Sequence, residues 1–385
     1  MTSESMIHVT AVMPCLNEEK TLGLCIEKAQ RAFREQGIAG EVVVADNGST
    51  DRSVEVAESL GARVVHEPRK GYGAALLAGI TAARGRIVVM ADADDSYDWS
   101  ALGDYVRKID EGYDLVMGNR FKGGIEPGAM PPLHRYLGNP VLSTLARVMY
   151  RIPINDFHCG MRAFTRAAFD RMNVRTPGME FATEMVVSAC HAGLRITEIP
   201  TRLYPDKRDR PPHLRSFRDG WRHLRFILTY APDWLYLIPG GLMFSLGMAG
   251  MAMLAPGPAQ IGSFSFGIHF LALASLFTLL GANIIGFALL ARLINAGRKP
   301  IKPSSAFGTL LSWFTLERGL VIGSVLTIAG LAVDGWLLVE WQTRGFGDME
   351  GTEHIAFVAT TIMLLGVNTV FASFLFNMLR DEHLE

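Results

Sequence analysis

The sequence lacks the features of a disulfide-stabilised or zinc-binding protein. It has only four cysteines, with no CxxC pair and no Cys/His cluster at zinc spacing. The N-terminal segment MTSESMIHVTAVMP contains no basic region followed by a long apolar run, so it does not resemble a secretory signal peptide. We therefore expect reduced thiols and a polar domain that stays in the cytoplasm.

An excess of charge of one sign is also missing. The net charge is -1, so bulk charge gives no sign of a nucleic-acid partner. The charges are unevenly distributed, because only 7 of the 37 Lys and Arg and 9 of the 38 Asp and Glu follow position 233. The hydrophobic content of 49% is therefore an average of two unlike halves. This pattern predicts a water-soluble domain joined to a membrane domain.

The apolar half is long enough for several membrane-spanning helices. Residues 234–291 contain no Lys, Arg, Asp or Glu, whereas one span needs only about 20 residues. Pro256-Gly257-Pro258 breaks this run, and two more apolar stretches follow. The expected spans lie near 234–255, 264–291, 319–341 and 355–379. Basic residues after the second span predict that this loop and both termini are cytoplasmic, namely Arg292, Arg298, Lys299 and Lys302.

One carboxylate interrupts the expected third span. Asp334 lies toward the outer end of that span, where water or a partner side chain could solvate it. We interpret Asp334 as structural, although an ion path is the alternative that it raises. The protein as a whole is expected to be integral to the inner or plasma membrane.

A basic amphipathic helix is expected between the two halves. Phe217, Trp221 and Leu224 share one face of a helix starting near His213, and arginines flank that face. This pattern is typical of a helix at the membrane interface, attracted to anionic lipid headgroups. The expected domains are 1–212, the interfacial helix 213–233, and the membrane domain 234–385.

In the polar half, apolar runs of strand length alternate with helical patterns. The expected strands are IHVTAVM, EVVVA, RVVHE, RIVVMA and DLVMG. Short strands separated by helices predict an α/β fold with a parallel sheet covered on both faces. Ligands of such sheets bind at the carboxyl ends of the strands. The polar residues after each strand are therefore the candidates for function.

Three polar turns follow the first, second and fourth expected strands. They are PCLNE at 14–18, DNGSTD at 46–51, and DADD at 92–95. Helix capping could explain one of Ser49, Thr50 and Asp51, but it does not require three neighbouring aspartates that repel one another. Two carboxylates one residue apart suit Mg²⁺ or Mn²⁺, which share oxygen ligands with a diphosphate. Asp92 and Asp94 are the predicted metal ligands.

A glycine-rich turn precedes the third expected helix. Lys70-Gly71-Tyr72-Gly73 resembles a phosphate-cradling loop but fits neither the P-loop nor the GxGxxG pattern. We interpret its glycines mainly as a tight turn into the helix. Phosphate contact by Lys70 and Gly71 is the second interpretation.

Seven motifs in order carry a resemblance to a known family. The series PCLNE, DNGSTD, KGYGAAL, DADD, GNR, DFHCGMRAF and GMEFATE resembles glycosyltransferase family 2. Within it, the chain is most similar to polyprenyl-phosphate and dolichyl-phosphate hexose synthases with C-terminal membrane helices. The motifs cover residues 6–233, and the remainder is similar only in architecture. The resemblance implies a GT-A, Rossmann-like nucleotide-sugar-binding domain followed by four transmembrane helices.

The resemblance also implies roles for individual residues. The donor nucleotide would be held by Pro14, Asn17, Glu18 and Asp46, with Asn47, Lys70 and Gly71 beside them. Asp92 and Asp94 would bind the metal and the sugar diphosphate, and Arg120 and Arg135 would hold the acceptor phosphate. Arg135 is expected in a loop after Pro131-Pro132, and a surface arginine is the alternative interpretation of it. Glu180 and Glu184, four residues apart, would share a helix face near the site, where they could orient the sugar or merely solvate that face. Replacing Arg218 and Arg222 of the interfacial helix with Glu should weaken acceptor use more than donor binding. Two residues depart from the family pattern, since Asn47 replaces its usual second aspartate and Ser96 its usual glutamine.

The implied reaction is inverting transfer of one hexose, glucose or mannose, from a UDP- or GDP-sugar to polyprenyl phosphate. The QxxRW motif of processive synthases is absent, which favours single-sugar transfer. A lipid monophosphate, with a second pKa of about 6, can attack without a strong general base. One alternative is transfer to a lipid hydroxyl with Asp95 as the base, and another is a transport or docking module with an inactive GT-A domain. The oligomeric state stays open, a homo-oligomer included.

Overall fold

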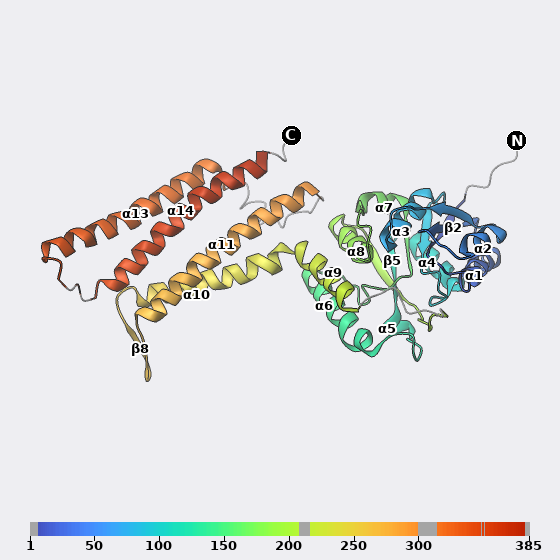
Figure 1. Cartoon of the computed structure of the whole chain (residues 1–385), viewed down its shortest axis with the longest axis horizontal. Helices are drawn as coiled ribbons and strands as arrows, with labels where there is room; N and C mark the ends of the chain where they lie inside the picture. Colours follow the sequence, from blue (N-terminus) through green and yellow to red (C-terminus); the bar gives the residue numbers. More distant parts are fainter. Residues whose placement is uncertain (1–6, 208–215, 299–313, 348, 350, 382–385) are drawn as a thin grey trace. The chain divides into compact units, whose positions relative to one another are not determined.

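The computed structural model describes residues 7–207, 216–298, 314–347, 349 and 351–381. The chain divides into two compact units, Met1–Ile227 and Leu228–Glu385 (Figure 1). The expected helix start near His213 and the loop residues Lys299 and Lys302 lie outside the described residues.

The first unit is built on a seven-stranded sheet with strand order β3-β2-β1-β4-β6-β5-β7. Its strands are β1 Val9–Cys15, β2 Gly40–Asp46, β3 Arg63–His66, β4 Ile87–Met90, β5 Leu115–Asn119, β6 Arg162–Thr165 and β7 Ile196–Pro200. The five expected strands are confirmed. They run parallel to one another, and the sheet contains a further strand that the sequence did not predict, β6, which runs antiparallel to both β4 and β5. This strand is only four residues long and begins with a buried arginine, so it gives no apolar run to recognise.

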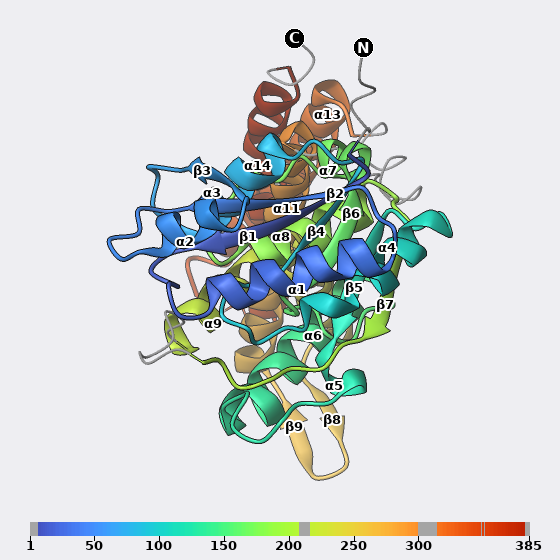
Figure 2. The same ribbon diagram turned by 90° about the vertical axis from the view of Figure 1, so that its right-hand side faces the viewer.

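Helices cover both faces of the sheet. They are α1 Leu22–Glu35, α2 Ser53–Ser59, α3 Tyr72–Ala82, η1 Trp99–Ala101, α4 Leu102–Asp110, α5 Arg120–Gly123, η2 His134–Gly138, α6 Asn139–Tyr150, α7 Arg166–Met172, α8 Phe181–His191 and α9 Ser216–Thr229. Figure 2 shows α1 in front of the sheet. Ile26 of α1 and Tyr105 of α4 pack with Ala11 of β1 in one buried cluster. On α3, Gly79 lies so close to β1 that an added Cβ would be 2.6 Å from Val12 Cγ1.

Among its described residues, the second unit contains four apolar helices long enough to cross a membrane, as expected. These segments are Asp233–Leu254, Ile268–Asn295, Leu316–Thr343 and Glu353–Arg380. They comprise η3 Asp233–Leu237 with α10 Ile238–Leu254, then α11 Ile268–Arg298, α13 Leu316–Thr343 and α14 Glu353–Asp381. The sequence did not predict a small hairpin after Pro256-Gly257-Pro258, formed by β8 Ala259–Ile261 and β9 Phe264–Phe266.

Glycines allow the apolar helices to approach closely. An added Cβ at Gly247 of α10 would lie 2.4 Å from the backbone nitrogen of Thr278 on α11. At Gly366 of α14 it would lie 2.6 Å from the Gly323 carbonyl oxygen on α13. Asp334 accepts a 3.4 Å hydrogen bond from Thr360 Oγ1, a partner of the kind that its structural interpretation requires.

Candidate active site

Two pockets open at the carboxyl ends of the strands in the first unit, and Asp92 lines both of them. The β1–β2 pocket, about 400 Å³, lies beside the ends of β1 and β2 and the turn into α3. The β4–β5 pocket, about 620 Å³, lies beside the turns after β4 and β5. Of the expected site residues, the first pocket contains Pro14, Glu18, Asn47, Lys70, Gly71 and Asp92. The second contains Asp92, Asp94 and Arg120.

Two residues expected to bind the nucleotide shape the β1–β2 pocket without lining it. The Asp46 carboxylate accepts hydrogen bonds from the Gly48 and Ser49 backbone nitrogens and contacts His66 Nδ1 at 3.1 Å. Burial opposes the charge of Asp46, but hydrogen bonds from Ser49 and His66 outweigh this effect and lower its pKa. Asn17, at a left-handed φ of 58°, accepts a 2.7 Å bond from the Thr50 backbone nitrogen. Both side chains therefore hold together the turns that form the pocket wall.

Asn47 lines the pocket, and its amide is used to hold a loop. Nδ2 donates to the carbonyl oxygens of Glu67 and Arg69 at 2.9 and 2.8 Å. Oδ1 accepts from the Gly71 backbone nitrogen at 2.8 Å. An aspartate could make only the last of these bonds, because a carboxylate has no donor. The departure from the family pattern thus has a structural explanation in the loop that carries Lys70 and Gly71.

Gly71 and Gly73 are required in this loop because the backbone of residues 176–177 packs directly against them. An added Cβ at Gly71 would lie 2.2 Å from the Pro177 carbonyl oxygen, and one at Gly73 would lie 2.3 Å from that of Thr176. Glu184 holds the approaching segment, because its carboxylate accepts bonds from the Arg175 and Thr176 backbone nitrogens at 3.0 and 2.8 Å. Glu184 is buried and lines neither pocket, so it is a positioning residue behind the β1–β2 pocket and neither orients the sugar directly nor solvates the helix face.

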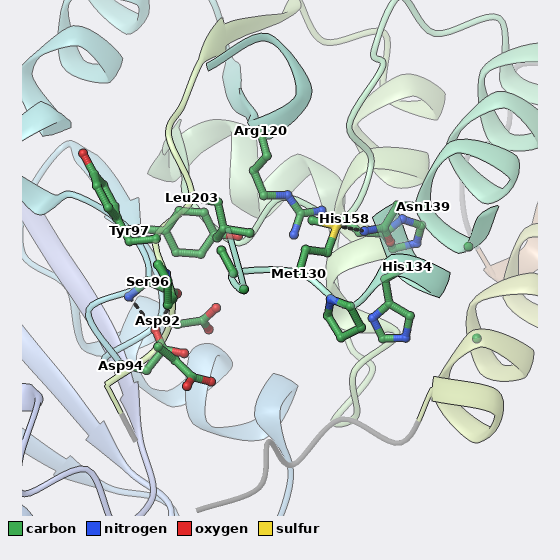
Figure 3. Close-up of a pocket in the computed structure, with 18 of the residues that line it drawn as sticks. Asp92, Asp94, Ser96, Tyr97, Arg120, Met130, His134, Asn139, His158 and Leu203 are labelled. Carbon is green, nitrogen blue, oxygen red and sulfur yellow. Dashed lines mark hydrogen bonds between the residues drawn. The ribbon is translucent and has the colours of Figure 1, made fainter. Parts of the chain in front are cut away.

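Asp92 and Asp94 form the carboxylate edge of the β4–β5 pocket (Figure 3). Asp94 Oδ1 accepts hydrogen bonds from both the backbone nitrogen and the hydroxyl of Ser96, at 3.0 and 2.5 Å. Trp99 Nε1 donates to the Asp92 carbonyl oxygen at 3.3 Å and ties down the same turn. Burial and the neighbouring Asp92 carboxylate raise the pKa of Tyr72 well above its usual value, so this phenol stays protonated beside the carboxylate.

These two carboxylates fit a metal that shares its coordination with a ligand. Within the described parts of the chain, no group of three His, Cys, Asp or Glu side chains is arranged to hold an ion by itself. Mg²⁺ is usually held in this way, by one or two carboxylates together with substrate phosphates and water. The donor set of Asp92 and Asp94 therefore suits a cation that arrives with a diphosphate.

Asp95 does not face either pocket. Its side chain is 2% exposed and forms ion pairs with Lys28 Nζ at 2.5 Å and Lys207 Nζ at 2.6 Å. Its φ of 60° lies in the left-handed region, a conformation that aspartate tolerates better than most residues. The two lysines stabilise this turn. The structure therefore gives no support to Asp95 as the general base considered for a hydroxyl acceptor.

Arg120 lies on the opposite side of the β4–β5 pocket from the carboxylates (Figure 3). Its Nε and Nη2 each donate to Asp156 at 2.7 Å, and its backbone nitrogen donates to the same carboxylate at 2.9 Å. Burial opposes the charge of Arg120, but Asp156 outweighs it and raises the pKa well above the usual range. Within the described residues, Nη1 has no hydrogen bond to the protein. This rigid cation can bind an anion in the pocket.

Two other expected acceptor or sugar contacts lie elsewhere. Arg135, expected in a loop, is part of η2, and its guanidinium contacts the Ile125 carbonyl oxygen at 3.5 Å and the Tyr136 ring. It does not line the β4–β5 pocket, whereas its neighbour His134 does. Glu180 occupies the N-cap position of α8 without a side-chain capping hydrogen bond, and it lines neither pocket.

Three histidines that the sequence analysis did not assign to the site line the β4–β5 pocket: His134, His158 and His223. The His158 and His223 rings meet edge to face at 4.7 Å, and His223 Nδ1 lies 2.7 Å from the Thr183 hydroxyl. Burial and the charges of His223, Arg120 and Arg162 lower the pKa of His158 well below its usual value, so this ring is neutral. These residues are far apart in the sequence, and no local pattern brings them together.

The fold and the site define a GT-A glycosyltransferase domain attached to a membrane domain. The sequence profile of Glycosyl transferase family 2 matches residues 10–172. That of the Glycosyltransferase family 2 C-terminal transmembrane region matches residues 289–380. Together with a full-length relative, these matches place the chain in glycosyltransferase family 2. It is an enzyme of that family and an integral membrane protein.

The full-length relative is the low-salt glycan biosynthesis hexosyltransferase Agl6 of Haloferax volcanii. It is 39% identical over 378 residues, covering 97% of this chain and 89% of the relative. The dolichyl-phosphate hexose transferase of the same organism is 34% identical over 200 residues, covering 52% and 84% of the two chains. A solved structure that is similar to this chain is glucosyl-3-phosphoglycerate synthase from Mycobacterium tuberculosis, in complex with Mn²⁺, UDP and glucosyl-3-phosphoglycerate. The match covers 58% of this chain and 77% of the synthase, with 23% sequence identity and a TM-score of 0.45.

Proposed function

We propose that this enzyme transfers a hexose, glucose or mannose, from a UDP- or GDP-sugar to polyprenyl phosphate. The observation that carries the proposal is the pair of pockets that meet at Asp92. The nucleotide occupies the β1–β2 pocket, among the residues of the PCLNE, DNGSTD and KGYG motifs. The lipid phosphate enters the β4–β5 pocket, where Arg120 faces it. The dolichyl-phosphate hexose transferase relative supports a lipid-phosphate acceptor of this kind.

Asp92 and Asp94 hold Mg²⁺ or Mn²⁺ in this proposal. When bound, the cation neutralises the diphosphate and stabilises it as a leaving group. Ser96 fixes the orientation of Asp94 through its two hydrogen bonds. Asn47 and Glu184 act on the donor side indirectly, because they position the loop that carries Lys70 and Gly71.

The acceptor phosphate supplies the nucleophile. One phosphate oxygen forms a bond to the anomeric carbon while the bond from that carbon to the nucleoside diphosphate breaks. Attack from the side opposite the leaving group inverts the anomeric configuration. Because a phosphate monoester is largely dianionic near neutral pH, it needs no protein base. Arg120 is prepared for this anion, since Asp156 already fixes its guanidinium and little side-chain freedom is lost on binding.

The arrangement disfavours the hydroxyl-acceptor alternative. A lipid hydroxyl requires a general base within hydrogen-bonding reach of its proton. Asp95, the candidate for that role, is held by Lys28 and Lys207 and lines neither pocket. The transport alternative with an inactive domain is disfavoured because both pockets and the carboxylate pair are present.

We also propose that the catalytic domain and both termini face the cytoplasm, with α9 at the membrane interface. Cysteine substitution tests this orientation at two exposed positions, Gln342 and Thr81. A membrane-impermeant maleimide should label Gln342→Cys on intact cells and Thr81→Cys only after permeabilisation. Labelling of Thr81→Cys on intact cells would contradict the proposed orientation.

The reaction is tested with the full-length protein in detergent. The assay combines labelled UDP- and GDP-hexoses, polyprenyl phosphate and Mg²⁺ or Mn²⁺, and it detects a lipid product that mild acid cleaves. Asp94→Asn should abolish this product, whereas Asp104→Asn, an exposed aspartate of α4, should retain it. Sugar transfer to diacylglycerol but not to polyprenyl phosphate would overturn the proposal.

A further inference from the structure

Helix α9 presents three different faces, and one of them belongs to the β1–β2 pocket. His223, Phe226 and Ile227 are buried in the first unit. Phe217 and Trp221 are 85% and 60% exposed, which leaves two aromatic side chains on an outer face. Arg218 and Arg222, four residues apart and therefore on one side of the helix, line the β1–β2 pocket.

These two arginines decide the charge of the pocket. Its other charged lining residues are Glu18, Lys70 and Asp92. Two carboxylates and one lysine give a formal charge of -1, which would repel a diphosphate. The arginines change the sign to +1, before any contribution from a cation at Asp92. They are therefore the cationic groups that make this pocket attractive to an anion.

We infer that Arg218 and Arg222 bind the diphosphate of the nucleotide sugar. This inference rests on the proposed function, and it assigns to the donor two residues that the sequence had associated with the lipid acceptor. Guanidinium groups suit this role, because their planar donors bind phosphate oxygens in pairs. Helix α9 ends at Thr229, and the apolar segment that starts at Asp233 follows a few residues later in the chain.

Glutamine variants test the inference through binding, without turnover. Isothermal titration of UDP and of GDP, each with Mn²⁺, into the full-length protein in detergent gives the affinity. Arg218→Gln and Arg222→Gln should each weaken binding of the preferred nucleotide by roughly tenfold, since each removes a charged donor. Affinity for the corresponding monophosphate should fall less. Arg225→Gln is the matched control, because Arg225 is an exposed arginine on the same helix that does not line the pocket.

The outcomes separate this inference from the proposed function. Unchanged nucleotide affinity in both glutamine variants, with a raised KM for polyprenyl phosphate, would overturn the inference and leave the proposed function intact. An equal loss in Arg225→Gln would also overturn it, because the effect would then be one of general charge. If the parent protein binds neither UDP nor GDP, both the inference and the proposed function fail. If a glutamine variant unfolds, the lysine variants Arg218→Lys and Arg222→Lys are measured in its place. Each should weaken nucleotide binding by less than tenfold. The loss should still exceed that in Arg225→Lys.

Discussion

Replacing Asn47 by the aspartate that is usual in the family should damage this enzyme. In the structure, the Asn47 amide nitrogen donates to two carbonyl oxygens, those of Glu67 and Arg69. In Asn47→Asp, a carboxylate oxygen takes the place of that donor and faces the same two carbonyls. Only the bond from the Gly71 backbone nitrogen persists.

The expected cost follows from these contacts. A carbonyl that loses its donor in a buried position costs about 1–3 kcal/mol, and Asn47→Asp affects two. Repulsion between the carboxylate and the carbonyl oxygens adds to this cost. The stronger bond from Gly71 to a charged acceptor returns about 1 kcal/mol. The net penalty on the loop conformation is about 2–5 kcal/mol. Because the nucleotide binds to this loop conformation, the lower value weakens binding by up to about 30-fold.

The assay compares nucleotide affinity and thermal unfolding in Asn47→Asp and Asn17→Asp. Asn17 provides a matched control, because its side-chain oxygen is the acceptor for Thr50 and an aspartate keeps that role. Asn17→Asp should remain within a few-fold of the parent affinity. An Asn47→Asp variant that binds nucleotide and melts like the parent would refute the reasoning, as would equal losses in both variants.

Two further predictions concern buried charges. Asp156→Ala should lower the free energy of unfolding by about 3–5 kcal/mol, because it leaves the buried guanidinium of Arg120 without its partner. Chemical denaturation of that variant and of the double variant Arg120→Met/Asp156→Leu checks this, and the double variant should regain most of the loss. The pKa of Asp46 is lower in the folded protein than its ordinary value of 3.8. At a pH above 3.8 the charged carboxylate therefore stabilises the folded state, and this stabilisation is lost as the pH falls through the lowered pKa. The difference in Tm between Asp46→Asn and the parent should therefore be large at pH 7 and shrink below about pH 4; a constant difference contradicts it.

Much of the architecture could be predicted because it depends on local patterns. The runs that form β1, β2 and β4 are apolar and bounded by turn residues, and the four membrane spans are long stretches of low charge. Strand β6 depends on something non-local. Its first residue, Arg162, is fully buried and donates to the carbonyl oxygens of Phe157, Cys159 and Ala182. Only the tertiary structure supplies those acceptors, so a sequence pattern that counts arginine as polar cannot detect the strand.

The pocket residues were predicted where they directly follow a strand and missed where they come from a distant helix. Asp92 and Asp94 are positioned by β4, so strand periodicity is sufficient to find them. Arg218 and Arg222 showed only the amphipathic pattern of α9, which also fits a helix at a lipid surface. Facing the pocket and facing headgroups require the same residue type at the same spacing, and only the packing of His223, Phe226 and Ile227 fixes how the helix is rotated.

The DADD turn shows why acidic residues of identical type can have different roles. Asp94 is oriented by Ser96, two residues away, and this contact is visible in the sequence as a local turn. Asp95 is neutralised by Lys28 and Lys207, which lie 67 and 112 positions away. Its charge is balanced within the protein, so it stabilises the turn, whereas the carboxylates of Asp92 and Asp94 line a pocket that a cation can enter. The distinction between a structural and a ligand-binding aspartate thus depends on where its counter-charge comes from, and for Asp95 that is set by the tertiary fold.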